Sequence, residues 1–308
     1  MALDYRLLTY RDENDAPRAG VMVDGRVHAA ATLFHDDPID SGSVLGLLQT
    51  WDLVRAWLSE RIASVDADDG IPVEQLVLDS PILYPGAVFA TGGNYTDHLE
   101  EMARIASRPL TKYRVDEPFF TMKSTVHSII GDKAPIRYPH FTRQLDWEAE
   151  IGVVIGRFAD DVSQAEAMDV VAGYVIINDL SARDYIRREG LPNQVIHDWF
   201  GQKCFRDSLP MGPWLTPAEF VPDPYDLRLR LWVNGVLKQD GNSKNMIYPL
   251  EELISNLSRH LTLRPGDVIS TGCPAGAGVG RGEFLELGDE IRIELSHCGA
   301  MTNTVVAG

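Results

Sequence analysis

The sequence predicts a mainly β protein of the α+β class, in which a small leading α+β module precedes a longer, strand-rich part. Two observations support this class. Short apolar runs bounded by turn residues recur from about residue 77 onward, which is typical of strands. Apolar residues at helical spacing are confined to a few segments. A chain of 308 residues can form one large domain or two smaller ones, and we expect two, comprising residues 1–78 and 79–308.

The leading module is expected to contain a hairpin and a helical segment. Residues 6–10, 20–23 and 26–30 read as strands, and Asp24-Gly25 is a hairpin turn signal between the last two. Leucine and valine residues recur at helical spacing within 44–62, and Ser43 or Thr50 could cap the helical turns there.

The second part is expected to be built from short strands with few helices. Leucines alternate strictly along 227–233 and end at Asn234-Gly235, a type I′ turn signal. Two further turns, at 265–267 and 287–289, each lead into an apolar strand. Helices are predicted only at 163–170 and 250–261, and at a start near Thr96 or Asp97.

Composition narrows the classes of partner. The formal net charge is -17, which argues against nucleic acid and anionic membranes because both bind basic surfaces. The three cysteines, Cys204, Cys273 and Cys298, lack metal-site spacing, so we expect a reducing, cytoplasmic location. No run approaches the roughly 18 apolar residues of a membrane span, and the first residues lack an apolar signal core.

Three carboxylates in two short runs form the candidate centre. Glu148 and Glu150 lie just before the apolar stretch 151–155. Side chains two residues apart in a strand share a face, so the two glutamates would point the same way. Asp179 ends a second apolar run, 173–177. Oxygen ligands of this kind suit a hard divalent cation. A solvated strand edge carrying ordinary surface acids is the alternative.

Two further charged pairs accompany these carboxylates. His98 and Glu101 are three residues apart, so they share a helical face. A carboxylate beside an imidazole can raise its basicity, which would suit a general base, although such a pair is often only a surface contact. Arg183 could pair with Asp184, hold a substrate carboxylate or orient the loop that carries Asp179.

A lysine and a glycine-rich run complete the set. Lys203 stands among apolar and aromatic residues, where it could stabilise an oxyanion, or it could be solvated. Residues 272–280 hold four glycines, which would let backbone closely approach a small ligand. The run lacks the lysine ending of a phosphate-binding loop and the following helix of a dinucleotide site.

Seven runs, taken in their order along the chain, resemble the fumarylacetoacetate hydrolase family. They are GGNYTDHLEE, FFTMKS, DWEAEIGVVIG, NDLSARD, the Lys203 run with PMGPWL, VNGVLKQDGN and PGDVISTGCPAGAGVG. The resemblance covers roughly residues 80–305, and the leading module is similar to that family's N-terminal domain. It implies a mixed β-sandwich roll, usually paired into homodimers.

The resemblance also implies roles for individual residues. It implies a divalent cation, Mg²⁺ or Mn²⁺ and in some members Ca²⁺, held by Glu148, Glu150 and Asp179. His98 and Glu101 match the water-activating pair, and Lys203 matches a conserved catalytic lysine. Contacts to the substrate are implied for the following residues: Arg183, Lys123, Gln239, Thr271 and Cys273.

The expected substrate is a small anionic 2,4-diketo or 2-oxo acid. The leading hypothesis is metal-dependent hydrolysis of a C–C bond in an acylpyruvate. A lyase or isomerase, for example an oxaloacetate decarboxylase or a hydroxydienedioate isomerase, is the second, and a non-catalytic binding protein is the third. Ile186 and Cys273 stand where many members carry Gln and Thr, which suggests a less polar distal group on the substrate.

Overall fold

The computed structural model describes residues 4–65, 69–107, 109–110, 112–114, 116–186 and 197–308. Its strands are β1 Tyr5–Arg11, β2 Pro17–Val23, β3 Arg26–Ala29, β4 Ile71–Pro72, β5 Val88–Thr91, β6 Phe120–Met122, β7 Ile129–Ile130, β8 Ile136–Arg137, β9 Leu145–Asp146, β10 Ala149–Ile155, β11 Val171–Asn178, β12 Ser181–Ala182, β13 Leu209–Pro217, β14 Arg228–Val233, β15 Val236–Asn242, β16 Val268–Ser270, β17 Glu290–Leu295 and β18 Gly299–Val306. Its α-helices are α1 Ala30–Leu33, α2 Val44–Gln49, α3 Trp51–Arg61, α4 Thr96–Ile105, α5 Trp199–Lys203 and α6 Leu250–His260. Its short 3₁₀ turns are η1 Ile62–Ser64, η2 Val73–Gln75, η3 Ala167–Val170, η4 Arg183–Tyr185, η5 Ala218–Phe220, η6 Ser243–Asn245 and η7 Gly278–Gly280.

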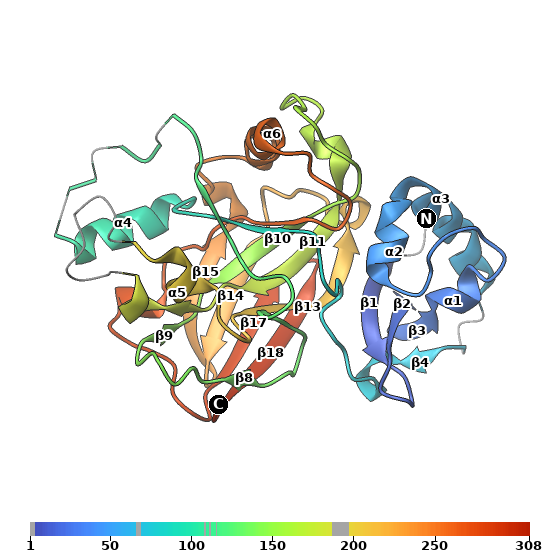
Figure 1. Ribbon diagram of the computed structural model, residues 1–308, viewed down its shortest axis with the longest axis horizontal. Helices are drawn as coiled ribbons and strands as arrows, with labels where there is room; N and C mark the ends of the chain where they lie inside the picture. The colour runs from blue at the N-terminus through green and yellow to red at the C-terminus, as the bar shows by residue number, and fades with distance from the viewer. Residues whose placement is uncertain (1–3, 66–68, 108, 111, 115, 187–196) are drawn as a thin grey trace.

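Two mixed sheets dominate the molecule, which confirms the predicted α+β, mainly β class. Within the described residues, the larger sheet runs in the order β4-β3-β2-β1-β13-β11-β10-β16-β5-β6, and a smaller one runs β15-β14-β17-β18-β8. Strands of both sheets, together with α6, contribute to one hydrophobic core. Figure 1 shows β10 and β11 in the middle of this arrangement, beside β14 and β17.

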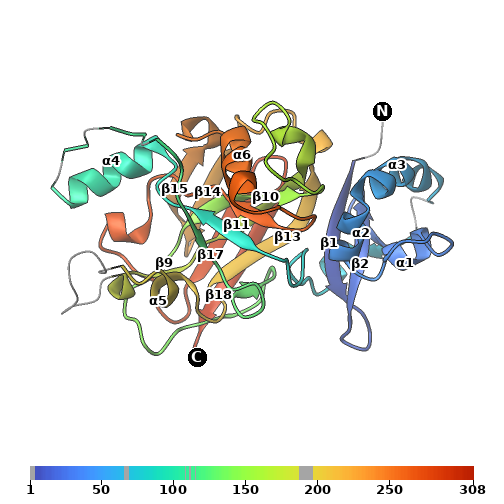
Figure 2. The same ribbon diagram turned by 45° about the horizontal axis from the view of Figure 1, so that its top comes forward.

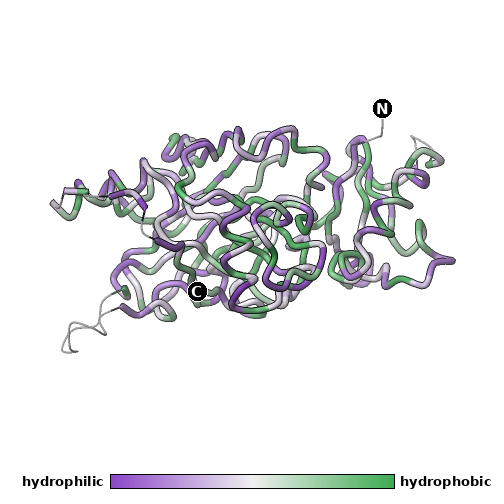
Figure 3. The backbone as a smooth tube through the Cα atoms, turned by 90° about the horizontal axis from the view of Figure 1, so that it is seen from above, coloured by the Kyte–Doolittle hydropathy of each residue, from purple (hydrophilic) through white to green (hydrophobic). Residues whose placement is uncertain are grey.

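The leading segment, which contains α1–α3, lies at one end of the molecule, and α4 lies at the other end (Figures 1 and 2). Its helices share a second core with the opposite face of β10 and β11, through Val154, Val175 and Ile177. In Figure 3 hydrophobic stretches run through the leading segment as well as the strand-rich part. The proposed division after residue 78 stays a prediction.

Most predicted turns and caps are found where the sequence places them. Asp24, Gly25, Asn234 and Gly235 all have positive φ, as type I′ turns require. Ser43 caps α2 by accepting a hydrogen bond from the Gly46 N–H, and the helical segment 44–62 is split into α2 and α3.

Two expectations about helices were wrong. Residues 163–170 form only the short turn η3, because Ser163 and Glu166 satisfy each other in a local turn and the chain must enter β11 at residue 171. Helix α4 begins at Thr96 with Tyr95 at the N-cap, so neither Thr96 nor Asp97 caps it. None of the helices in the described part of the chain combines the length and apolar character that a bilayer crossing requires.

Candidate active site

The three carboxylates of the candidate centre meet because β10 and β11 pair antiparallel. Glu150 lies opposite Ile177, and the ladder continues where the Asp179 N–H donates to the Glu148 carbonyl at 2.8 Å. One oxygen from each of Glu148, Glu150 and Asp179 lies within 4.8 Å of the others. All three residues are at most 5% exposed, so a solvated strand edge was the wrong interpretation.

Buried cations surround these carboxylates. Lys203 Nζ donates to Glu148 and, at 2.6 Å, to Asp179. Lys123 Nζ lies 2.8 Å from the other Asp179 oxygen, and Arg183 pairs with Glu148. Lys203 is therefore buried and paired, and the interpretation of a solvated lysine was wrong.

Asp146 is a fourth buried carboxylate that the sequence reasoning did not assign to the site. Arg183 Nε donates to it at 2.7 Å, and the N–H groups of Gly278 and Val279 donate to its two oxygens. Arg183 thus orients the carboxylates rather than pairing with Asp184, which accepts from Thr142 and Arg143. A signal was present, because Asp146 stands two residues before Glu148.

The four buried carboxylates outnumber the three buried cationic side chains beside them. The pKa values of the two glutamates, Glu148 and Glu150, shift in opposite directions. Burial opposes ionisation of Glu148, but Arg183 and Lys203 outweigh it and hold the pKa of that carboxyl well below its usual range. Burial and the neighbouring charges of Asp179 and Glu148 raise the pKa of Glu150 to about 8. Glu150 accepts from Ser270 Oγ and the Gly272 N–H. An added cation would relieve this excess negative charge.

His98 and Glu101 lie on one face of α4, as their spacing predicts. His98 Nδ1 is 3.8 Å from Glu101 Oε2, and the two side chains are only 12% and 10% exposed. Burial raises the pKa of Glu101, but His98 and the Gly276 N–H outweigh it, so the pKa is lowered overall. The carboxylate is therefore held in its charged form beside the imidazole.

The glycine-rich run approaches the protein's own carboxylates. The Gly276 N–H donates to Glu101 at 3.0 Å, and the Gly278 N–H donates to Asp146 at 2.6 Å. A Cβ on Gly280 would lie 2.5 Å from the Glu101 carboxyl carbon. The sequence predicts close backbone approach to a small ligand, whereas Gly276 and Gly278 approach Glu101 and Asp146 and fix those side chains.

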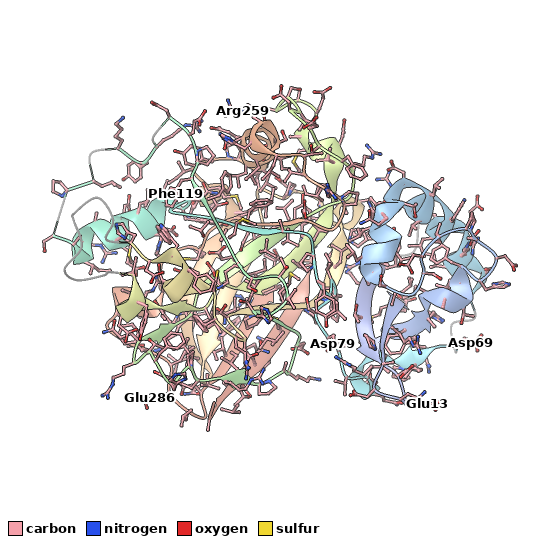
Figure 4. The ribbon with its side chains drawn as sticks, in the orientation of Figure 1. Glu13, Asp69, Asp79, Phe119, Arg259 and Glu286 are labelled. Atoms are coloured by element: carbon pink, nitrogen blue, oxygen red, sulfur yellow. The ribbon has the colours of Figure 1, made fainter. Side chains whose placement is uncertain are left out.

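A cavity of about 140 Å³ opens onto this cluster. The described residues that line it are Ala90, Thr91, Gly92, Gly93, His98, Phe119, Thr121, Glu148, Glu150, Asp179, Arg183, Ile186, Trp199, Gln202, Lys203, Gly272 and Cys273. The rings of Phe119 and Trp199 lie 6.1 Å apart. Figure 4 marks Phe119 close to α4. Neither aromatic residue was predicted for the site, although FFTMKS contains Phe119.

Three predicted substrate contacts do not line this cavity among the described residues: Lys123, Gln239 and Thr271. Lys123 is buried behind Asp179. Gln239 accepts from the Ala149 N–H and donates to the Pro274 carbonyl, so it ties two strands to the loop after β16. Cys273 and Arg183 do line the cavity. The roles of all five as substrate contacts stay predictions.

A larger groove, of about 930 Å³, lies elsewhere on the protein. Tyr138, Lys238 and Glu283 are among the residues that line it, and none of the carboxylates of the cluster does. Size alone would favour this groove. We assign the site to the smaller cavity because its buried charges are costly to maintain without a function.

Comparisons with known proteins show which family the chain is similar to. The family profile described as fumarylacetoacetate (FAA) hydrolase C-terminal matches residues 87–306. The mitochondrial oxaloacetate tautomerase of Xenopus laevis is 36% identical over 312 residues, which span 99% of this chain and 91% of the relative.

Solved structures are similar to this chain over nearly its whole length, including the leading segment. Fumarylacetoacetate hydrolase from Exiguobacterium antarcticum has a TM-score of 0.77 at 29% identity, covering 99% of this chain and 100% of that one. Maleylpyruvate hydrolase from Sphingobium sp. SYK-6, in complex with manganese(II) and pyruvate, has a TM-score of 0.77 at 26% identity, covering 98% and 99%.

Proposed function

The chain belongs to the fumarylacetoacetate hydrolase family, and from this premise we propose that it is a divalent-cation-dependent enzyme acting on a small anionic 2-oxo acid. The observation that carries the proposal is the meeting of three buried carboxylates with His98 at one cavity, where Glu101 lies beside the imidazole. An ordinary core would not bury so many ionised groups, because each costs several kcal/mol to desolvate.

Glu148, Glu150 and Asp179 would hold the cation. Their donor set is all oxygen and buried, which suits Mg²⁺ or Mn²⁺, and also Ca²⁺. Burial, together with the charges of Asp179 and Glu148, raises the pKa of Glu150 to about 8, so a bound cation would offset the repulsion among these carboxylates. When bound there, such a cation supplies Lewis-acid stabilisation of an enolate.

His98 would move the proton. Glu101, fixed by the Gly276 N–H, holds the imidazole in the cavity wall and favours its taking up a proton. In a keto–enol interconversion, His98 would take a proton from the carbon beside the 2-oxo group. The C–H electron pair would form the C=C bond, the C=O π pair would pass to the oxygen, and that oxygen would take a proton from water. Lys203 and Arg183 would lower the cost of the negative charge at that oxygen.

The leading reaction we propose is tautomerisation of an oxaloacetate-like 2-oxo acid. It is favoured by the Xenopus relative, which is named an oxaloacetate tautomerase and spans nearly the whole chain. Cleavage of an acylpyruvate C–C bond by water is the second candidate. It is favoured by the His98–Glu101 pair, which could deprotonate water, and by the likeness to maleylpyruvate hydrolase.

The two candidates share a site but give different products, so one experiment separates them. Metal-stripped protein is incubated with enol-oxaloacetate and with acetylpyruvate, with and without Mg²⁺ or Mn²⁺. Loss of the enol absorbance above the metal-only blank, without carbon dioxide release, supports the tautomerase. Metal-dependent formation of acetate and pyruvate supports the hydrolase.

Controls show whether the assigned residues carry the activity. His98→Gln should lose either activity by about 100-fold or more while cation binding is retained. A matched change on the same helix but on its exposed side, Glu100→Gln, should leave the rate unchanged. Unchanged turnover by His98→Gln would remove that residue from the mechanism. A homodimer and a cytoplasmic location also stay proposals, and the Xenopus relative is named as mitochondrial.

A further inference from the structure

A second group of donor atoms lies beside the carboxylate cluster and has a different chemistry. One donor atom each from His98, Glu148 and Cys273 lie within 4.8 Å of one another. They come from α4, from the residue before β10 and from the loop after β16. Glu148 and Cys273 are at most 5% exposed, and all three residues line the same cavity.

The donors of this second group are one nitrogen, one oxygen and one sulfur. Hard cations such as Mg²⁺ prefer the three oxygens of the neighbouring group, whereas imidazole and thiolate select softer divalent ions. Zn²⁺ commonly takes three protein ligands and one water. His98 Nδ1 lies 3.8 Å from Glu101 and has no hydrogen-bond partner among the described residues, so ligation by this imidazole would break no hydrogen bond there.

We propose that His98, Glu148 and Cys273 form a second metal site that takes Zn²⁺ or Cd²⁺ and shares Glu148 with the carboxylate site. On binding, the Cys273 S–H bond breaks, the proton leaves to solvent and a metal–sulfur bond forms, with no change of oxidation state. Glu148 already contacts Arg183 and Lys203. The bound ion would take over part of the charge compensation that these two side chains give to Glu148.

Occupancy of this site has a consequence for the enzyme. It withdraws His98 from proton transfer and one oxygen of Glu148 from the neighbouring cation, so Zn²⁺ should inhibit. The inhibition rests on the proposed function, but the binding does not. Because Cys273 supplies the only sulfur donor of the group, the sensitivity should depend on this residue and not on the other two cysteines.

The direct test is a Cd²⁺ titration of the metal-stripped full chain, followed by the ultraviolet absorption of cadmium–thiolate bonds. We expect about one equivalent of Cd²⁺ to produce the band, and Cys273→Ser to abolish it. Cys298→Ser is the matched control, because that thiol is also buried but belongs to the central hydrophobic core and does not line the cavity. The band should persist in this variant.

Two variants, each affecting one site only, distinguish the two sites. Glu150→Gln removes a ligand of the carboxylate site only, so it should weaken Mg²⁺ binding and leave the cadmium band. Cys273→Ser should do the reverse, and His98→Gln should weaken Cd²⁺ at least about tenfold. X-ray absorption at the zinc edge of the unmodified protein should show one sulfur neighbour, whichever variants fold.

Three results would overturn the proposal: no cadmium band in the unmodified protein, a band that survives Cys273→Ser, or a zinc spectrum with oxygen and nitrogen neighbours alone. A cadmium band in a protein that turns over neither oxaloacetate nor acetylpyruvate would leave the site standing and remove only its inhibitory role.

Discussion

The strand pair β10–β11 has two halves, one with apolar buried side chains and one with charged buried side chains. Toward Ile155 and Val171 both faces are apolar, one packed against the central core and the other against the leading segment. Toward Glu148 and Asp179 the same two strands end in buried carboxylates. The ladder joins the two halves, with a register shift between Val154 and Ile155 at the apolar end, so the main difference between the halves lies in their side chains.

The comparison shows two ways of making a buried region. In the apolar half, each side chain gains free energy on burial without depending on a particular partner. In the charged half, each ion is tolerated only because others compensate it: Lys203 and Lys123 face Asp179, and Arg183 faces Asp146 and Glu148. The first half should therefore respond to mutation locally, and the second as a network whose response depends on added cation.

Removing a positively charged side chain from the charged half should have the largest effect on the free energy of unfolding. Lys203→Met leaves Glu148 and Asp179 without their shared partner, so the metal-free protein should lose about 3–5 kcal/mol of unfolding free energy. Saturating Mn²⁺ should recover a large part, because the bound ion replaces the lost charge. Urea unfolding with and without Mn²⁺ measures both. An equal loss in the two conditions would mean that no cation binds near Lys203.

Removing a carboxylate should affect binding more than folding. Glu150→Gln keeps an acceptor for Ser270 and Gly272 but removes a charge from the proposed metal site. Affinity for Mg²⁺ or Mn²⁺ should fall about 100-fold, which equals about 2.7 kcal/mol. The metal-free protein should be as stable as the unmodified one or more so. Calorimetric titration checks the affinity, and retained affinity would exclude Glu150 as a ligand.

The same glutamate predicts how the charged half depends on pH. The folded-state pKa of Glu150, about 8, is raised above its ordinary value of 4.5, so the folded chain binds this proton more tightly than the unfolded chain. The stability it contributes is present below pH 4.5 and is lost as pH rises toward 8. Over that range cation affinity should increase by about tenfold per pH unit.

Glu148 should act in the opposite direction and in a different window. Its pKa is lowered, so the stability that it contributes is present above pH 4.5 and is lost as the medium becomes more acidic. Thermal unfolding of the metal-free protein between pH 5 and 8, with a parallel titration of Mg²⁺, measures the Glu150 effect. A cation affinity that does not change with pH would contradict it.

The smallest effect is expected from an apolar side chain of these strands, even one close to the carboxylates. Ile176→Val removes one methyl group from β11, three residues before Asp179, at a fully buried position of the central core. It should cost about 1 kcal/mol, with or without Mn²⁺, and leave cation affinity unchanged. Urea unfolding checks this. A dependence on Mn²⁺ as strong as that of Lys203→Met would mean that the two halves are energetically coupled and that the distinction does not hold.

Much of the fold could be predicted because its signals are local. Alternation along β14, the Asn234-Gly235 turn and the leucine spacing of α6 are set by residues close together in the chain. Segment 163–170 was predicted wrongly, because its local helical signal lost to the geometry of the chain entering β11. Local preference is weak where few residues connect two fixed strands.

The sequence by itself determined the family, the mainly β class and the residue types of the centre, because motif order and hydrophobic period do not depend on long-range contacts. Only the tertiary structure decided which charges compensate which. Of the roles left open for Arg183, it selected pairing with Asp146 and Glu148. It also placed Lys123 against Asp179 and the Gly276 N–H against Glu101. Ion pairs are chosen by distance and by the cost of desolvation, and both are fixed only once segments far apart in the chain are packed together.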